Sequence, residues 1–384
     1  MLSVKQLCYA SALFIIASSL LIKSVYVFTL QDSWLTVILA ILISLIIVSV
    51  YGALESRHPG LDHVELCETV FGKVLGKIVG ALYVFFFLSL AILNLEDTGA
   101  FVNGSILPQT PVTIVYVCMV LVCALSVSKG PKICLYSTML VILIGSILVM
   151  NLLLLINKAE LENFLPVLTH PPKNYALAIH SLLMLPLGEI FAFLTFAPHM
   201  KKPEEMGSAL RGGILVGGFM LFIIVVRDIA VMGGYLQYVN HPTFSSIRLI
   251  EVGDFLTRLE ILYASILLTA FTFKISVCYY AAITGLARLL RIDNYRIFIG
   301  IFGVLIVVAT RGVFQSSFEH NEWKRSAPVY STFFLIILPL LLLLVSFIRF
   351  GRHPKKPAAR ENQDASQDGD AETGFSGSMA PGES

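Results

Sequence analysis

The sequence contains few charged residues for a chain of 384 amino acids. Asp, Glu, Lys and Arg make up only 14% of it, whereas hydrophobic residues make up 57%. Because soluble proteins devote about a quarter of their residues to these four charged types, the composition excludes an ordinary soluble protein. The formal net charge is only +2, so nothing in the sequence indicates a nucleic-acid-binding surface.

Motifs for metal, redox or hydrolytic chemistry are also missing from the sequence. The six cysteines have no paired spacing of the kind that metal and redox sites use, and most of them lie inside apolar runs. No Ser-His-Asp arrangement, His-Glu-x-x-His motif or phosphate-binding glycine motif accompanies the ionisable residues. We therefore expect a protein that is not an enzyme and that needs no metal or cofactor.

Apolar runs, in contrast, extend from Leu7 to Ile348, and hydrophobicity stops abruptly at Arg349. About 20 apolar residues in a helix cross a hydrocarbon core of about 30 Å. Ten runs approach this length: 7–28, 34–54, 77–95, 112–128, 133–156, 175–197, 209–232, 260–284, 296–313 and 328–348. The sequence therefore predicts an all-α integral membrane protein with about ten transmembrane helices. Nine or eleven stay open, because run 112–128 is short and Pro186 divides the sixth run.

Lys and Arg residues gather in alternate connections between these runs. With the N-terminus inside, the inner connections near residues 57–77, 129–132, 201–211 and 288–296 each hold two or three of them. Cytoplasmic connections of membrane proteins carry such an excess of Lys and Arg. The sequence therefore predicts that both termini face the cytosol.

The chain divides into two regions of different composition. Residues 1–350 form the predicted transmembrane domain. Residues 351–384 are rich in Gly, Ser, Ala, Asp and Glu, with Phe375 as their only aromatic residue. Such a segment cannot bury enough apolar surface to offset the entropy lost on ordering, so we expect a disordered cytoplasmic tail.

Five ionisable residues inside the apolar runs need an explanation, because charges within a bilayer are costly and usually face a cavity or a partner. They are Lys23, Glu189, Arg227, Asp228 and Lys274. Lys23 lies near the outer end of the first run, where its side chain can reach the interface. Arg227 and Asp228 are neighbours that diverge by about 100° on a helix, so we expect them to form ion pairs with other helices.

Glu189 follows Pro186 and Gly188 in the middle of the sixth run. Pro186 removes a backbone donor and Gly188 relaxes the chain, so the sequence predicts a break near mid-membrane. In secondary transporters, such a break exposes backbone groups that bind the charged ends of a substrate. Glu189 is thus a candidate proton carrier, amine partner or buried latch. Lys274 lies too deep in the eighth run to reach the interface, and we expect it to pair with Glu189 or Asp228 or to line a polar path.

A series of short motifs carries a family resemblance through its order and spacing. The motifs are Gln31-Asp32-Ser33-Trp34, Pro59-Gly60, Gly72-Lys73, Gly76-Lys77, Leu107-Pro108-Gln109-Thr110-Pro111, Asn163-Phe164-Leu165-Pro166-Val167, Pro186-Leu187-Gly188-Glu189, Pro198 and the stretch from Arg248 to Glu260. Over about residues 4–350, the chain resembles the endospore germination permeases, the B subunits of nutrient germinant receptors. This family belongs to the amino acid/polyamine/organocation transporter superfamily.

The resemblance implies a LeuT-like fold with two inverted five-helix repeats and with broken first and sixth helices around a central site. The repeats would cover about 7–156 and 175–313, with the last run, 328–348, in the second repeat. The family normally has a glycine at the break of the first helix, where this sequence reads Ala17-Ser18-Ser19. The implied site residues are Ala17, Ser18 and Ser19 for a carboxylate end, Pro186 to Glu189 for an amine end, and Tyr83, Phe87, Leu185 and Thr272 for the side-chain pocket.

The resemblance further implies a subunit that senses a small germinant, for which an amino acid is the expected ligand, in the inner membrane of a dormant bacterial spore. The implied partners are an A subunit and a lipoprotein C subunit. Two alternatives stay open. A proton-coupled amino acid transporter would use Glu189 or Lys274 as its proton carrier, and a scaffold that binds no ligand would have an occluded centre.

Overall fold

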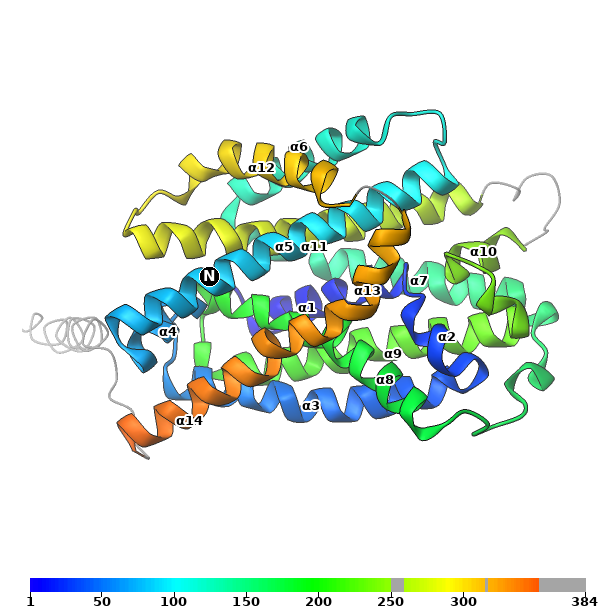
Figure 1. Ribbon diagram of the computed structural model, residues 1–384, viewed down its shortest axis with the longest axis horizontal. Coiled ribbons are helices and arrows are strands. Elements are labelled where there is room, and N and C mark those ends of the chain that lie inside the picture. Colours follow the sequence, from blue (N-terminus) through cyan, green and yellow to red (C-terminus); the bar gives the residue numbers. More distant parts are fainter. Residues whose placement is uncertain (250–258, 315–316, 352–384) are drawn as a thin grey trace, which may run out of the picture.

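The computed structural model describes residues 1–249, 259–314 and 317–351, and most of its helices run along the long axis of the molecule (Figure 1). Apart from one isolated bridge between Leu2 and Met200, all regular secondary structure in these residues is helical. The principal elements are α1 (Val4–Ser19), α2 (Ser24–Thr29), α3 (Ser33–Arg57), α4 (His63–Phe71), α5 (Lys73–Ser105), α6 (Val112–Ser128), α7 (Ser137–Leu155), α8 (Pro172–Leu182), η5 (Leu183–Leu187), η6 (Gly188–His199), α9 (Met206–Met232), α10 (Pro242–Arg248), α11 (Leu259–Leu290), α12 (Phe298–Val313), α13 (Ser317–Thr332), η10 (Phe333–Ile337) and α14 (Leu338–Phe350).

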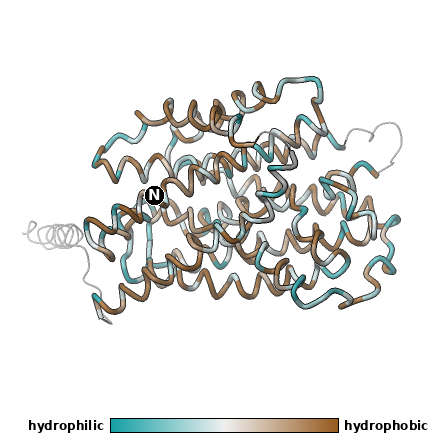
Figure 2. Tube along the Cα trace, viewed as in Figure 1, coloured by the Kyte–Doolittle hydropathy of each residue, from teal (hydrophilic) through white to brown (hydrophobic). Residues whose placement is uncertain are grey.

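The helices have the length and composition of membrane spans. Eight helical stretches in the described residues are long and apolar enough to cross a membrane, and α1 and α6 are shorter apolar helices. Figure 2 shows hydrophobic residues along most helices and hydrophilic residues mainly in the connections at the two ends. Many large apolar side chains, such as those of Ile46, Leu125 and Ile348, are exposed on the bundle surface, which is unusual for a soluble monomer and is expected of a lipid-facing surface. The prediction of a multi-pass all-α membrane protein is confirmed.

The first predicted helix is broken. Helix α1 ends at Ser19, and α2 begins only at Ser24. The break frees backbone groups that must be satisfied inside the protein, because lipid offers no hydrogen bonds. The hydroxyl of Tyr263 in α11 donates to the carbonyl oxygen of Leu20 at 2.7 Å. The break thus follows directly after the Ala17-Ser18-Ser19 segment.

The sixth predicted helix is broken at the expected place. Helix α8 passes into the π-helical turn η5, in which Leu185 has an extended conformation with φ −134° and ψ 107°. The 3-10 segment η6 then begins at Gly188. Pro186 has no N–H to continue the α-helical pattern, which accounts for the break at this position. Helix α1 contacts both η5 and η6, so the two breaks meet inside the bundle.

Helix α1 lies at the centre of the bundle and packs closely on α9. Glycines in α9 make this approach possible: a Cβ added at Gly213 would lie 1.9 Å from Oγ of Ser11, and one added at Gly217 would lie 2.8 Å from Cβ of Ile15. Small residues allow helices in membranes to approach in this way. Helices α6 and α12 pack against each other at one edge of the molecule, beside α5 and α11 (Figure 1). Most of the motif from Arg248 to Glu260, and the tail 352–384, lie outside the described residues.

Candidate functional site

An ion pair between Lys274 and Glu189 lies where the two broken helices meet. Lys274 comes from α11, and Glu189 is the second residue of η6. The ammonium group of Lys274 donates hydrogen bonds to the carboxylate of Glu189 and to the hydroxyl of Ser18 near the end of α1. Nζ of Lys274 also lies 4.8 Å from the centre of the Phe14 ring. Of the two partners expected for Lys274, the structure selects Glu189.

Both members of this pair are almost completely buried. Lys274 is 2% exposed and Glu189 is 1% exposed. Moving either charge out of water costs several kcal/mol, which only a close partner and further hydrogen bonds offset. The Ser18 hydroxyl and the Phe14 ring supply such additional contacts to the ammonium group. Each charge therefore depends on the other, and the centre of the bundle is occluded in this conformation.

The other residues expected near the ligand's charged ends are buried and direct no side-chain group at the ion pair. Ala17 is buried, and the hydroxyl of Ser19 donates to the carbonyl oxygen of Ile15 at 2.9 Å within its own helix. Thr272, which was expected in the side-chain pocket, also donates within its own helix, to the carbonyl oxygen of Leu268 at 2.8 Å. Gly188 is tightly enclosed, since a Cβ there would lie 2.6 Å from the carbonyl oxygen of Leu183. Among the three residues at the first break, Ser18 alone reaches the ion pair through its side chain.

Tyr83 and Phe87 lie in an aromatic cluster, not at the ion pair. The ring of Tyr83 stacks on that of Phe191 with centroids 4.9 Å apart, and its hydroxyl donates to the carbonyl oxygen of Phe334 at 3.0 Å. Phe87 packs edge-on against His63 at 5.1 Å. Among the described residues, no hydrogen bond, ion pair or ring contact joins Tyr83 or Phe87 to Lys274 or Glu189. Phe191 links the two groups through the chain, because it follows Glu189 by two residues.

Arg227 and Asp228 form a separate polar cluster. The expectation that they pair with other helices is wrong: Nη2 of Arg227 lies 2.7 Å from Oδ1 of Asp228 in the same helix. The Cα–Cβ bonds of Arg227 and Asp228 diverge, but the arginine side chain is long enough to fold back onto the carboxylate of Asp228. Asp228 also accepts hydrogen bonds from Tyr26 of α2 and from Thr243 and Ser246 of α10, at 3.1, 2.8 and 3.0 Å. Asp228 thus joins α2 and α10 to α9, whereas Lys23 reaches Oδ1 of Asn240 at 2.9 Å.

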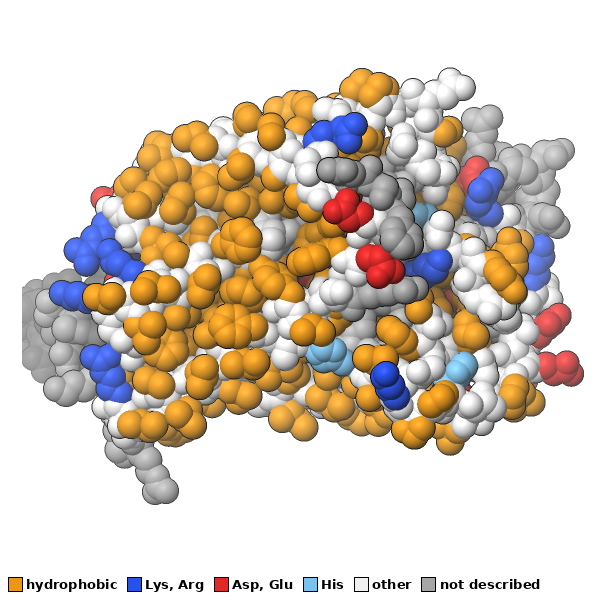
Figure 3. Space-filling view, in the orientation of Figure 1, with side chains coloured by type: hydrophobic (Ala, Val, Ile, Leu, Met, Phe, Trp, Pro, Cys, Tyr) orange, Lys and Arg blue, Asp and Glu red, His pale blue; other side chains and the backbone are white. Residues whose placement is uncertain are grey.

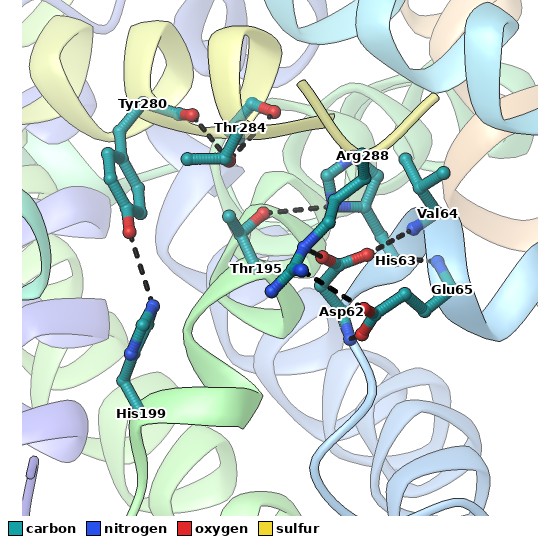
Figure 4. A network of polar contacts seen from close by, with 10 residues as sticks. Asp62, His63, Val64, Glu65, Thr195, His199, Tyr280, Thr284 and Arg288 are labelled. Atoms are coloured by element: carbon teal, nitrogen blue, oxygen red, sulfur yellow. Dashed lines mark hydrogen bonds and ion pairs between the residues drawn. The ribbon is translucent and has the colours of Figure 1, made fainter. Parts of the chain in front are cut away.

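A second network lies toward the C-terminal ends of η6 and α11, on the side of the membrane predicted to be cytoplasmic (Figure 4). It was not predicted from the sequence. Nε of Arg288 lies 3.0 Å from Oδ2 of Asp62, and Nη1 lies 3.5 Å from Oε1 of Glu65. Oγ1 of Thr195 lies 3.0 Å from Nδ1 of His63, and burial lowers the pKa of His63 to about 4. The segments that carry the central pair therefore also carry this network. Asp62 and Glu65 form a capping box at the N-terminus of α4, where each side chain accepts a hydrogen bond from the backbone N–H of the other, and their spacing of three residues was the signal in the sequence.

A third network holds residues 166–175, in the loop before α8 and its first turn, against the short helix η1 (Leu30–Asp32) between α2 and α3. Asp32 is buried and accepts hydrogen bonds from the backbone N–H of Leu168 at 3.0 and 3.1 Å and from the hydroxyl of Tyr175 at 2.5 Å. Nε2 of Gln31 donates to the carbonyl oxygen of Pro166 at 2.9 Å. Two of the short motifs, one at 31–34 and one at 163–167, thus lie together. Their spatial contact was not visible in the sequence.

Known proteins of similar sequence point to one family. A sequence model of a family described as spore germination protein matches residues 1–315. The chain belongs to this family. Spore germination protein KB of Bacillus subtilis (strain 168) is 26% identical to this germination protein over 372 residues, which cover 92% of the chain and 96% of the relative. The putative spore germination protein YfkT of the same strain is 23% identical over 326 residues, covering 82% and 87%.

A solved structure confirms the fold of this spore germination family member. Mhp1, a nucleobase-cation-symport-1 family transporter in a closed conformation with bromovinylhydantoin bound, superimposes with a TM-score of 0.68. The match covers 92% of this chain and 79% of that protein, at 12% sequence identity. At this identity the likeness shows the fold alone. The chain therefore has the LeuT-like fold with broken first and sixth helices that the resemblance implied.

Proposed function

We propose that this protein is the permease-like membrane subunit of a spore germinant receptor, and that it binds a small zwitterionic nutrient such as an amino acid. The observation that carries the proposal is the buried Lys274–Glu189 pair at the meeting point of the two helix breaks. Family membership supports a role in spore germination. The transporter-like fold supports a ligand site at this position, because such folds bind substrates at broken helices.

The ion pair offers one charge of each sign to a zwitterion. The ligand's carboxylate would take the ammonium group of Lys274 and the hydroxyl of Ser18, and its amine would take the carboxylate of Glu189. In this exchange each buried charge keeps a partner, so the binding of ligand does not leave an uncompensated ion. Ala17 and Ser19 would add backbone contacts, and Leu185 and Thr272 remain in the proposed side-chain pocket. Tyr83 and Phe87 would border this pocket only through the ring of Phe191, which both of them contact.

Binding at this point would move three elements relative to one another. The pair joins η6 to α11, and Ser18 joins both to α1. A ligand that inserts between them must separate these elements, and it shifts their equilibrium only by its differential affinity for the two states. The same η6 and α11 end in the cytoplasmic network of Asp62, His63 and Arg288. We infer that the ligand signal reaches the cytoplasmic side through these two elements.

The proposed function also implies a location, an orientation in the membrane and partner subunits. We propose a location in the inner membrane of the spore with both termini in the cytosol, and an A subunit and a lipoprotein C subunit as partners. One end of the visible face carries a group of Lys and Arg side chains next to a wide hydrophobic region, whereas Lys, Arg, Asp and Glu side chains are mixed toward the opposite end (Figure 3). The group of basic side chains at one end is consistent with the proposed orientation, because cytoplasmic segments are rich in Lys and Arg.

Germination of spores tests the function directly. Spores that lack this gene are compared with wild-type spores against a panel of amino acids, sugars and nucleosides. The expected result is the selective loss of one nutrient response, which the wild-type gene restores and Glu189→Gln, at normal protein level, does not. Ser146→Ala is the matched control, because Ser146 is exposed on α7 and its hydroxyl bonds only to its own helix. A full response with Glu189→Gln would refute the central site.

The scaffold and transporter alternatives predict different results. The occluded Lys274–Glu189 pair fits a scaffold that binds no ligand, and such a protein would show no nutrient-specific defect after Glu189→Gln. A proton-coupled transporter would take up the nutrient in proteoliposomes when a pH gradient is applied.

A substitution at Gly188 does not test binding. In Gly188→Leu the new side chain would collide with the backbone at Leu183 and lower the protein level, so a lost response would not distinguish misfolding from lost binding.

A further inference from the structure

A groove on the surface of the bundle runs between α3 and α9. It has a volume of about 650 Å³ and is lined by residues from these two helices only. Its position follows from a close helix contact: a Cβ added at Gly52 would lie 2.7 Å from Cα of Gly207, so the backbones nearly touch there. About one helical turn further along both helices, beside Ser49 of α3 and Arg211 of α9, the groove opens.

The groove is polar at one end and apolar at the other. Ser49 and Arg211 lie toward the end of the bundle where α3 finishes and α9 begins, together with Ser208. One turn deeper along each helix, Ile46 of α3 and Leu215 of α9 line the groove, and both are exposed. Although the two helices are antiparallel here, Ser49 lies at about the same depth in the membrane as Arg211, and Ile46 at about the same depth as Leu215. This polarity matches a lipid whose head lies at the interface and whose chain points into the membrane.

The charge in the groove has no partner within the described protein. The guanidinium group of Arg211 and the hydroxyl of Ser208 make no hydrogen bond or ion pair with any other described residue. The hydroxyl of Ser49 donates to the carbonyl oxygen of Leu45 at 2.8 Å and keeps its acceptor capacity. An arginine with unused donors beside a serine hydroxyl suits a phosphate, which accepts several charge-assisted hydrogen bonds.

We propose that this groove binds an anionic phospholipid of the cytoplasmic leaflet. The phosphate takes the guanidinium of Arg211 and the hydroxyl of Ser208, and an acyl chain lies along Ile46 and Leu215. Basic pockets between transmembrane helices on the cytoplasmic side recognise anionic lipid head groups in this manner. The site differs from the proposed germinant site, because it faces the membrane and shares no residue with the Lys274–Glu189 centre. Because α9 packs on α1, a lipid bound to α9 would also stabilise the position of α1.

The test uses the full-length protein purified into nanodiscs that contain phosphatidylglycerol and phosphatidylcholine in equal amounts. Lipid retained after transfer to detergent is identified by native mass spectrometry. The expected result is enrichment of phosphatidylglycerol on the wild-type protein and a loss of this enrichment by about tenfold in Arg211→Gln, the effect of losing one charge-assisted hydrogen bond to the phosphate. The matched control is Arg296→Gln, an exposed arginine in the connection between α11 and α12, which should retain the wild-type ratio.

Three outcomes would overturn the proposal. The first is equal retention of the two lipids by the wild-type protein, which would mean that Arg211 only extends to the interface. The second is an unchanged ratio in Arg211→Gln, or an equal loss in Arg296→Gln. The third comes from a photoreactive amino acid in place of Leu215 in native membranes: a protein adduct would assign the groove to a partner subunit, whereas a phospholipid adduct supports the proposed occupant.

Discussion

The central ion pair predicts an unusual pattern of stabilities in a double-mutant cycle. The three variants are Glu189→Leu, Lys274→Met and the two changes combined. Each single change leaves one buried charge without its partner, so each should lower the free energy of unfolding by about 3–5 kcal/mol. The double variant replaces the pair by apolar side chains of similar volume, which is often neutral or stabilising. Its loss should therefore be far smaller than the sum of the two single losses.

Equilibrium unfolding of the purified proteins in detergent micelles measures this coupling. Groups that contact each other commonly show interaction free energies of about 0.5–3 kcal/mol, and independent sites add within about 0.5 kcal/mol. Because both Glu189 and Lys274 are almost completely buried, we expect coupling at or above the top of that range. Additive losses in the double variant, or single losses below about 1 kcal/mol, would refute the assignment of a buried ion pair.

The same double variant separates stability from function. If the pair binds the germinant, the double variant should accumulate in spores at the normal level and still fail to restore the nutrient response. Spores that respond normally with the double variant would show that Glu189 and Lys274 serve the fold alone. Protein level is checked on spore membranes with an antibody before germination is measured.

Two further predictions concern other parts of the structure. Burial lowers the pKa of His63 to about 4, below its ordinary value of 6.5, so the unfolded chain takes up this proton at a higher pH than the folded protein does. The free energy of unfolding is therefore unaffected by this group above about pH 6.5, and it falls by up to about 3 kcal/mol as the pH approaches 4. The midpoint of thermal unfolding, measured between pH 7 and pH 4.5, should depend less on pH in His63→Gln than in the wild-type protein. Glu65, whose pKa is raised by burial, is present in both proteins and contributes equally to both profiles. The same dependence of the midpoint on pH in both proteins would contradict this prediction. In α9, Gly213→Ala should destabilise by about 1–3 kcal/mol because its Cβ collides with α1, whereas Gly300→Ala, with open space around it, should be neutral or slightly stabilising; equal midpoints of thermal unfolding would contradict the close packing.

Several features of the site could be predicted from the sequence for local reasons. Pro186 cannot continue an α-helix, so the break of the sixth span follows from a single residue. Glu189 and Lys274 were candidates because charges deep in apolar runs are costly and require partners. The choice between Glu189 and Asp228 as the partner of Lys274 could not be made, because it depends on how η6, α9 and α11 pack.

The sequence by itself determined that this protein lies in a membrane, that it is helical, and where the sixth helix breaks, because these properties depend on composition and on residues close together in the chain. Only the tertiary structure decided that Lys274 meets Glu189, that Arg227 folds back onto Asp228, and that Tyr83 joins an aromatic cluster away from the ion pair. Such contacts depend on the rotation and depth of each helix against its neighbours. Those quantities follow from the packing of the whole bundle, which no short stretch of sequence contains.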